Sequence, residues 1–232
     1  MAAIQFKRKQ VVSAHQALNE WASRAATAAD LVVLPEMAAS GYVFENRTEA
    51  FKAAELPEGP TFQALSPVAV TYGCWVVAGF PERDKDRLFN SALIINPKGE
   101  LAFVYRKTLL FETDETWATP GDSGYRLFDT KWGSFTVGIC MDLNDDQFVQ
   151  WCARQKPGVL AFPTNWVQED GDVWSYWAWR MHSLSTSLVA ANTYGSEGGL
   201  QFSGQSIILD QGNILSFAPV QGNSIIWGTV GG

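Results

Sequence analysis

Ser134-Phe135-Thr136-Val137-Gly138-Ile139-Cys140-Met141-Asp142-Leu143-Asn144-Asp145-Asp146 is the stretch that decides the fold. Its apolar, β-branched run has the length of a strand and ends at a cysteine, and the acidic and amide residues that follow favour the start of a helix. We therefore expect Cys140 at the end of a strand, facing a helix N-terminus. Unpaired backbone N–H groups there would lower the thiol pKa and offer donors to an oxyanion, which suits a nucleophile. A small buried hydrophobe that closes a strand is the alternative.

The composition favours one sizeable hydrophobic core. The 232 residues are 47% hydrophobic and 18% charged, which predicts a single domain over residues 1–232. The net charge of −7 argues against nucleic acid or an anionic membrane as a partner. The sequence has no long apolar run and no signal peptide at its start, so we expect a cytoplasmic protein. The three cysteines fit neither a disulfide framework nor a zinc site.

Two parts of the chain share a pattern of strand, helix and buried strand. In the first part, Ser13 is the candidate cap of a helix, and the buried strand is Leu31-Val32-Val33-Leu34. In the second part, a helix follows Cys140, and the next strand, residues 159–162, runs into Pro163. Strands joined in this way are parallel, so the strand ends of the two halves are expected to converge on one site.

Two charged residues directly follow predicted strands. Glu36 comes after the buried strand 31–34, where α/β folds place ligands and where a partly dry environment raises a carboxyl pKa toward that of a useful base. A solvated loop acid is the other interpretation. Lys107 follows the second strand of a hairpin formed by residues 89–105, and a surface lysine that marks an edge strand is its alternative.

The choice of base narrows the possible chemistry. Histidine is the usual partner of a catalytic cysteine, but His15 and His182 lie on predicted helices, which makes a Cys–His pair the weaker option. Glu36, Lys107 and Cys140 remain. In this set the carboxylate would take the thiol proton and the ammonium would stabilise the oxyanion of a tetrahedral intermediate. Such a set suits acyl transfer from a C–N bond.

Several motifs follow one another in order over nearly the whole chain. They are Ile4-Gln5-Phe6, Leu31-Val32-Val33-Leu34-Pro35-Glu36-Met37 with Ser40-Gly41-Tyr42, Tyr105-Arg106-Lys107, Gly138-Ile139-Cys140-Met141-Asp142, and Ala191-Asn192-Thr193-Tyr194-Gly195 followed by Gly204-Gln205-Ser206. Together they resemble the nitrilase superfamily of carbon–nitrogen hydrolases. The resemblance implies an α-β-β-α sandwich with facing sheets and outer helices, and a homodimer that associates through helices. It implies no metal and no organic cofactor.

The resemblance also implies roles for individual residues. Glu36 would be the general base, Lys107 the stabiliser of the oxyanion, and Cys140 the nucleophile of a thioester acyl-enzyme that water then hydrolyses. Glu115 matches the family's second glutamate, and Glu112 is the competing assignment. The backbone N–H of Met141 would share the oxyanion with the lysine. The expected substrate-binding residues are Met141, Asn165, Trp166 and Tyr42.

The substrate is less well defined by the sequence. Residues 138–144 are similar to the protein N-terminal amidase branch, which deamidates N-terminal Asn and Gln, whereas Thr108 and Met141 depart from the histidine and the aromatic residue of many members. We expect an amidase that acts on a small-molecule amide or on a peptide N-terminus. Nitrile or N-carbamoyl hydrolysis with the same triad and a non-catalytic scaffold are the alternatives. The candidates for binding a substrate ammonium, which are equally interpretable as loop and cap acids, are Glu112, Asp114, Asp145 and Asp146.

Overall fold

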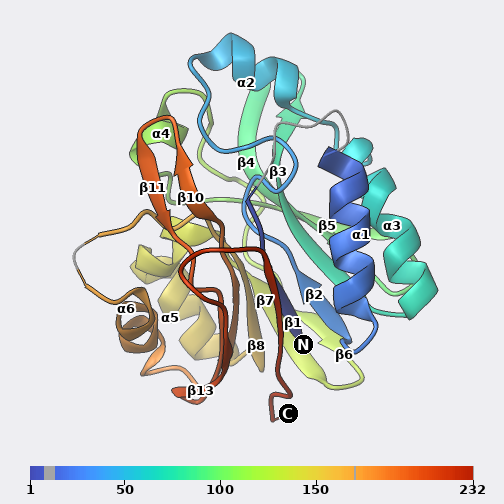
Figure 1. The fold of residues 1–232 in the computed structure, drawn as a ribbon, viewed down its shortest axis with the longest axis vertical. Coiled ribbons are helices and arrows are strands. Elements are labelled where there is room, and N and C mark those ends of the chain that lie inside the picture. Colours follow the sequence, from blue (N-terminus) through green and yellow to red (C-terminus); the bar gives the residue numbers. More distant parts are fainter. Residues whose placement is uncertain (8–13, 170, 232) are drawn as a thin grey trace.

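The computed structural model describes residues 1–7, 14–169 and 171–231. Two six-stranded sheets face each other, with helices on their outer sides (Figure 1). Buried residues of both sheets share one hydrophobic cluster that fills the space between them. This arrangement is the expected α-β-β-α sandwich. Ser13 lies outside the described residues, and the single-domain organisation of residues 1–232 stays a prediction.

The first sheet has the strand order β14-β1-β2-β3-β4-β5. Strand β1 is parallel to β2 and β2 is parallel to β3, whereas the remaining neighbours are antiparallel. Helices α1 and α3 cover its outer side (Figure 1). The bounds of these elements and of α2 are β1 Ala2–Gln5, α1 Ala14–Ala26, β2 Leu31–Val33, α2 Arg47–Ala53, α3 Pro60–Tyr72, β3 Trp75–Asp84, β4 Arg87–Ile95, β5 Leu101–Arg106 and β14 Ser224–Trp227.

The second sheet repeats this plan, with the order β13-β12-β9-β8-β7-β6 and parallel pairs β7 with β8 and β8 with β9. Helices α5 and α6 connect the parallel strands, and β10 and β11 form a small separate ribbon. The two β-α-β halves of the sequence thus correspond to the centres of the two sheets. The bounds are β6 Phe128–Thr130, β7 Gly133–Val137, α5 Asp146–Gln155, β8 Val159–Pro163, α6 Val173–Met181, β9 Ser187–Ala191, β10 Tyr194–Glu197, β11 Leu200–Ser203, β12 Ile207–Asp210 and β13 Asn213–Phe217.

The helices begin and end where local chemistry predicts. In α1 the buried residues Leu18, Ala22 and Ala25 recur at helical spacing, so one face of the helix packs on the sheet. Helix α3 begins at Pro60, which needs no N–H partner in the first turn. It ends at Tyr72 and is capped by Gly73, whose φ of 62° lies in the left-handed region that favours glycine.

One glycine fixes the position of Glu36. Gly79 of β3 donates its N–H to the Pro35 carbonyl at 3.1 Å and accepts from the Ala38 N–H at 2.9 Å. A Cβ atom added at Gly79 would lie 2.5 Å from the Glu36 Cα, closer than real Cβ contacts. The backbone after β2 can therefore lie directly against β3 because residue 79 has no side chain.

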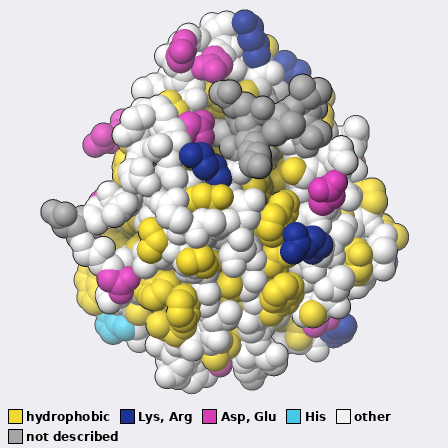
Figure 2. All heavy atoms as spheres, in the orientation of Figure 1, with side chains coloured by type: hydrophobic (Ala, Val, Ile, Leu, Met, Phe, Trp, Pro, Cys, Tyr) yellow, Lys and Arg dark blue, Asp and Glu magenta, His cyan; other side chains and the backbone are white. Residues whose placement is uncertain are grey.

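One face of the molecule carries exposed apolar side chains. In the face drawn in Figure 2, hydrophobic side chains gather over its lower half, the region that β13 occupies in Figure 1. Ile214 and Phe217 of β13 are 51% and 57% exposed, and Trp179 of α6 is 57% exposed.

None of the helices in the described ranges is both long and apolar enough to cross a bilayer.

Candidate active site

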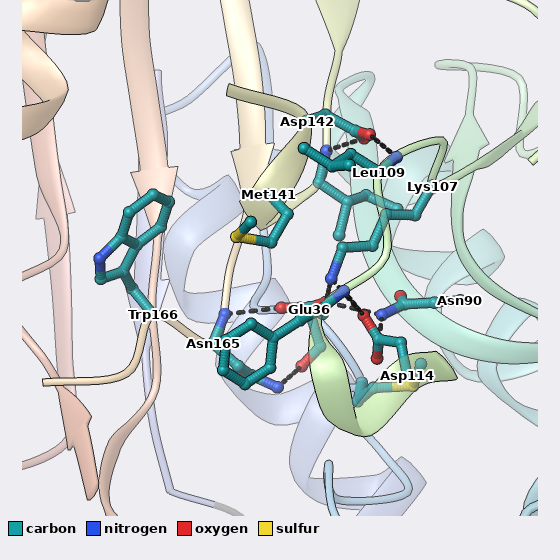
Figure 3. A network of polar contacts seen from close by, with 12 residues as sticks. Glu36, Asn90, Lys107, Leu109, Asp114, Met141, Asp142, Asn165 and Trp166 are labelled. Atoms are coloured by element: carbon teal, nitrogen blue, oxygen red, sulfur yellow. Dashed lines mark hydrogen bonds and ion pairs between the residues drawn. The ribbon is translucent and has the colours of Figure 1, made fainter. Parts of the chain in front are cut away.

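Three charged side chains meet inside the molecule (Figure 3). Glu36 follows β2, Lys107 follows β5, and Asp114 lies in the short helix α4 (Glu112–Glu115). The Lys107 Nζ atom lies 2.9 Å from Glu36 Oε1 and 2.5 Å from Asp114 Oδ2, and all three side chains have an exposed fraction of 0%. One ammonium thus lies between two carboxylates, away from water.

Asp114 occupies the place that the sequence analysis gave to Glu115, with Glu112 as the alternative. Both glutamates are exposed, so the assignment of the second carboxylate is corrected by one position. Asp114 is the third residue of α4, and its Oδ2 accepts the N–H of Phe111 at 3.1 Å. A carboxylate that reaches back to the residue before the helix is the acidic half of a capping box, but Phe111 has no side-chain acceptor for the other half, so the sequence lacks the capping-box signature here.

Asn90 joins the two carboxylates. Its Nδ2 donates to Glu36 Oε1 at 2.7 Å and to Asp114 Oδ1 at 3.1 Å. An asparagine is a poor strand former, yet Asn90 lies fully buried within β4. An asparagine inside an otherwise apolar strand is therefore a sequence signal for a functional position.

The surroundings shift the pKa values of the charged groups. Burial raises the pKa of Glu36, the Lys107 ammonium lowers it, and the Asp114 carboxylate raises it, with a net increase. Burial lowers the pKa of Lys107, but the charges of Glu36 and Asp114 raise it well above its ordinary value. The lysine therefore stays an ammonium at neutral pH, while Glu36 gains affinity for a proton.

Asn165 holds Glu36 from the opposite sheet (Figure 3). Its backbone N–H donates to Glu36 Oε2 at 2.8 Å, and its Nδ2 donates to the Glu36 backbone carbonyl at 2.9 Å. Because Asn165 follows β8, one residue of the second sheet fixes both the carboxylate and the backbone of a residue of the first.

Cys140 lies where the sequence predicts, after β7 and at the start of the 3₁₀ helix η1 (Cys140–Asn144). Its φ of 44° is in the left-handed region, which is strained for a residue other than glycine. Burial raises the pKa of its thiol, the Glu36 carboxylate raises it further, and Lys107 lowers it. The expected lowering of the pKa is therefore wrong, because the two sheets enclose the sulfur. The resting group is a thiol that needs a base.

Asp142 ties the cysteine segment to the lysine segment. Its Oδ2 accepts the Ile139 N–H at 2.9 Å, and its Oδ1 accepts the N–H groups of Thr108 and Leu109 at 2.9 and 3.0 Å. The Tyr105 hydroxyl adds a bond of 2.8 Å to Oδ2. This carboxylate is fully buried and every described bond to it comes from a donor, so it fixes the two segments relative to each other.

A cavity of about 170 Å³ opens beside Cys140. All four residues expected to bind substrate line it, namely Tyr42, Met141, Asn165 and Trp166. The Tyr42 hydroxyl is buried and has no hydrogen-bond partner among the described residues. A buried hydroxyl of this kind is available to a bound molecule. Further lining residues are Phe111, Asn144, Val167, Glu169 and Tyr176.

The acids suggested for an ammonium lie elsewhere. The lining of this cavity includes none of Glu112, Asp114, Asp145 and Asp146. Among the residues that the structure describes, the carboxylate in this lining is that of Glu169, an exposed residue in the segment between β8 and α6. Nothing in the local sequence around Glu169 distinguishes it from an ordinary loop acid.

Comparisons with known proteins agree on one family. A family model for carbon-nitrogen hydrolases matches residues 2–230. A protein named nitrilase from Pyrococcus abyssi is 37% identical over 194 residues, which cover 82% of this chain and 72% of the relative. A protein N-terminal amidase from Schizosaccharomyces pombe is 29% identical over 246 residues, covering 87% and 85%.

A solved structure shows the same fold. The crystal structure of an amidase from Nesterenkonia sp. superposes with a TM-score of 0.84 at 21% identity, covering 97% of this chain and 87% of that one. At this identity the likeness concerns the architecture of the two sheets and their helices.

Proposed function

This chain belongs to the carbon–nitrogen hydrolase family, the nitrilase superfamily, and from that premise we propose that it is an amidase that releases ammonia from a primary amide. The family resemblance of the sequence is thereby confirmed, as is its class as a hydrolase of C–N bonds. The observation that carries the proposal is the buried set of Glu36, Lys107 and Asp114 beside the cavity at Cys140. In this proposal Glu36 is the base, Lys107 is the cation and Cys140 is the nucleophile.

In the proposed first half-reaction, the Cys140 sulfur attacks the amide carbon while its proton passes to Glu36. The carbonyl electrons move onto oxygen, and Lys107 and the backbone N–H of Met141 stabilise the oxyanion. The oxyanion then collapses, the C–N bond breaks, and the proton held by Glu36 leaves on the ammonia. A thioester remains on the cysteine.

In the second half-reaction, Glu36 takes a proton from water, and the resulting nucleophile attacks the thioester carbon. The C–S bond breaks, the acid leaves, and Glu36 returns its proton to the thiolate, which restores the thiol. The raised pKa of Glu36 supports this role, because a base with greater proton affinity is better matched to a thiol whose own pKa is raised.

We propose the amide of an N-terminal Asn or Gln as the first substrate to test, since one relative is named a protein N-terminal amidase. The nitrilase name of another relative makes nitriles the second class. N-carbamoyl amines are the third, because the same triad would attack their carbonyl. The other alternative is a non-catalytic scaffold, in which the same buried charges would take part in no reaction.

The decisive experiment measures ammonia release and intact-protein mass with a panel of substrates. The panel contains peptides with N-terminal Asn or Gln, free dicarboxylic monoamides, N-carbamoyl amines and nitriles. Ammonia from amides together with an acyl adduct that is absent in Cys140→Ala supports the proposal. Release from nitriles alone would replace the amidase with a nitrilase. No adduct and no ammonia with any compound would favour the scaffold.

We further propose a homodimer and a cytoplasmic location. The exposed Trp179, Ile214 and Phe217 supply apolar surface that a second copy would cover. Sedimentation velocity over a range of protein concentrations tests the dimer, and a monomer at every concentration would contradict it.

A further inference from the structure

We propose that Glu169 selects substrates that carry a cationic group, so that this protein prefers amides with a protonated amine. The inference rests on the proposed amidase function and names the chemical class of its substrate. Glu169 lies at the mouth of the cavity beside Cys140, and the other lining residues there are neutral. Among the described residues, no lysine or arginine lines this cavity.

The walls next to Glu169 suit a cation. Trp166 and Tyr176 lie side by side with ring centroids 5.5 Å apart, and Phe111 lines the same cavity. The Tyr176 hydroxyl donates to Asn144 Oδ1 at 2.7 Å, which fixes the ring. Aromatic faces attract an ammonium through their quadrupole, and a neighbouring carboxylate adds a full negative charge. A substrate carboxylate would be repelled by the negative charge of Glu169, and no cation in the described lining would offset that repulsion.

Glu169 is free to pair with a ligand. Within the described ranges its side chain forms no ion pair and no hydrogen bond. The segment that carries it is nevertheless anchored, because the Gln168 N–H donates to the Gln201 carbonyl at 2.7 Å and Val167 bridges to Phe202. The backbone thus places the carboxylate, which has no partner in the part of the chain that the structure describes.

The surroundings also allow a long substrate. A second groove of about 150 Å³ shares Trp166, Val167, Glu169 and Tyr176 with the catalytic cavity. Its further lining includes polar Gln168 and Gln205, and no lysine or arginine among the described residues. An Asn or Gln at a peptide N-terminus would place its side-chain amide at Cys140, its ammonium near Glu169 and its following residues in this groove.

The test compares substrates that differ in one charge. One pair is the peptide Asn-Ala-Ala with a free or an acetylated N-terminus, and the other is 5-aminopentanamide and hexanamide. In the native protein we expect kcat/KM to be about tenfold to a hundredfold higher for the cationic member of at least one pair, the size of one charge-assisted hydrogen bond. Glu169→Gln should bring that ratio close to one, chiefly by lowering kcat/KM for the cationic member.

Two further variants sharpen the test. Glu169→Lys should invert the preference, so that glutaramate, an anionic monoamide, becomes better than 5-aminopentanamide. Glu58→Gln makes the same chemical change at an exposed carboxylate that lines neither cavity, and it should keep the native ratio. Calorimetric titration of the same compounds into Cys140→Ala measures the charge preference without turnover.

The outcomes separate this inference from the amidase proposal. Turnover of amides with equal rates for charged and neutral members, or a ratio that survives Glu169→Gln, overturns the role of Glu169 and leaves the amidase intact. No ammonia from any amide overturns the amidase, and equal binding of the paired compounds to Cys140→Ala then overturns the cation preference as well. A ratio that changes equally in Glu58→Gln would assign the effect to overall charge and also overturn the inference.

Discussion

The charged side chains around Lys107 and the carboxylate of Glu169 at the rim of the cavity differ in their burial and in their pairing. In the buried cluster, Glu36, Lys107 and Asp114 have fully buried side chains, and each is paired with its neighbours. At the rim, Glu169 is exposed and has no partner within the described part of the chain. The difference suggests that the interior determines the reaction, whereas the rim determines which amide undergoes it. Changes in the buried cluster should therefore slow every substrate alike.

The largest effect is expected from Cys140→Ala. Loss of the nucleophile should reduce turnover of all amides by about 10⁵-fold or more, since members of such a set act as a unit. The fold should persist because the substitution removes a single buried atom. The measurements are ammonia release, acyl-adduct mass and thermal unfolding. Cys152→Ala is the matched control, a buried cysteine on α5 whose removal should keep turnover. Retained activity in Cys140→Ala would exclude this thiol from the mechanism.

Glu36→Gln should follow, with turnover lower by about 10³- to 10⁴-fold for charged and neutral amides alike. The amide side chain keeps the shape of glutamate but cannot accept the thiol proton. Glu82→Gln is the control, because Glu82 is also buried and bonds to Arg106 away from the cavity. Its rate per folded molecule should equal that of the native protein. Near-native rates in Glu36→Gln would break the assignment of the base.

Asp114→Asn should reduce kcat by about tenfold to a hundredfold and also shift its pH dependence. The Asp114 charge raises the pKa of Glu36, so removing it should lower that pKa. Because the base acts when ionised, the acidic fall in kcat/KM, which we expect above the ordinary glutamate pKa of 4.5, should move to lower pH. Glu115→Gln should leave both rate and profile unchanged. A shift to higher pH in Asp114→Asn would contradict the electrostatic role.

The smallest effect is expected from Tyr42→Phe. Its unpartnered hydroxyl would donate one neutral hydrogen bond to the substrate, so its loss should cost about twofold to tenfold in kcat/KM for every amide. The melting temperature should not fall, because within the described residues the hydroxyl has no hydrogen-bond partner to lose. A drop in stability without a change in kcat/KM would show that the hydroxyl is structural.

The sequence predicted those parts of the fold and site that have a local signature. Glu36 and Cys140 follow apolar runs that end abruptly, and Lys107 ends a hairpin, so their strand-end positions could be read directly. Gly73 and Pro60 marked the limits of α3 for the same reason. The repeated pattern of the two halves predicted strand ends that converge on one site, whereas the facing sheets were implied by the family resemblance.

The missed features depend on burial or on a single turn of backbone. Consecutive acids in the loop after Lys107 look alike until α4 turns Asp114 inward and leaves Glu115 in solvent. The sign of the pKa shift at Cys140 depends on how completely the sheets enclose the sulfur. Glu169 is a candidate only because segments that are distant in the sequence form the cavity that it lines. None of these can be derived from spacing along the chain.

The partition of the site between two sheets matters for a chain that is still folding. Glu36 and Lys107 follow strands of the first sheet, whereas Cys140 and Asn165 follow strands of the second, and the two bonds from Asn165 to Glu36 cross between the sheets. A newly synthesised chain produces Glu36 and Lys107 before Cys140 and Asn165, so a chain that ends between the two pairs lacks a complete site. Recovery of the proposed activity during refolding should therefore report the docking of the two sheets, whose buried residues share one hydrophobic cluster.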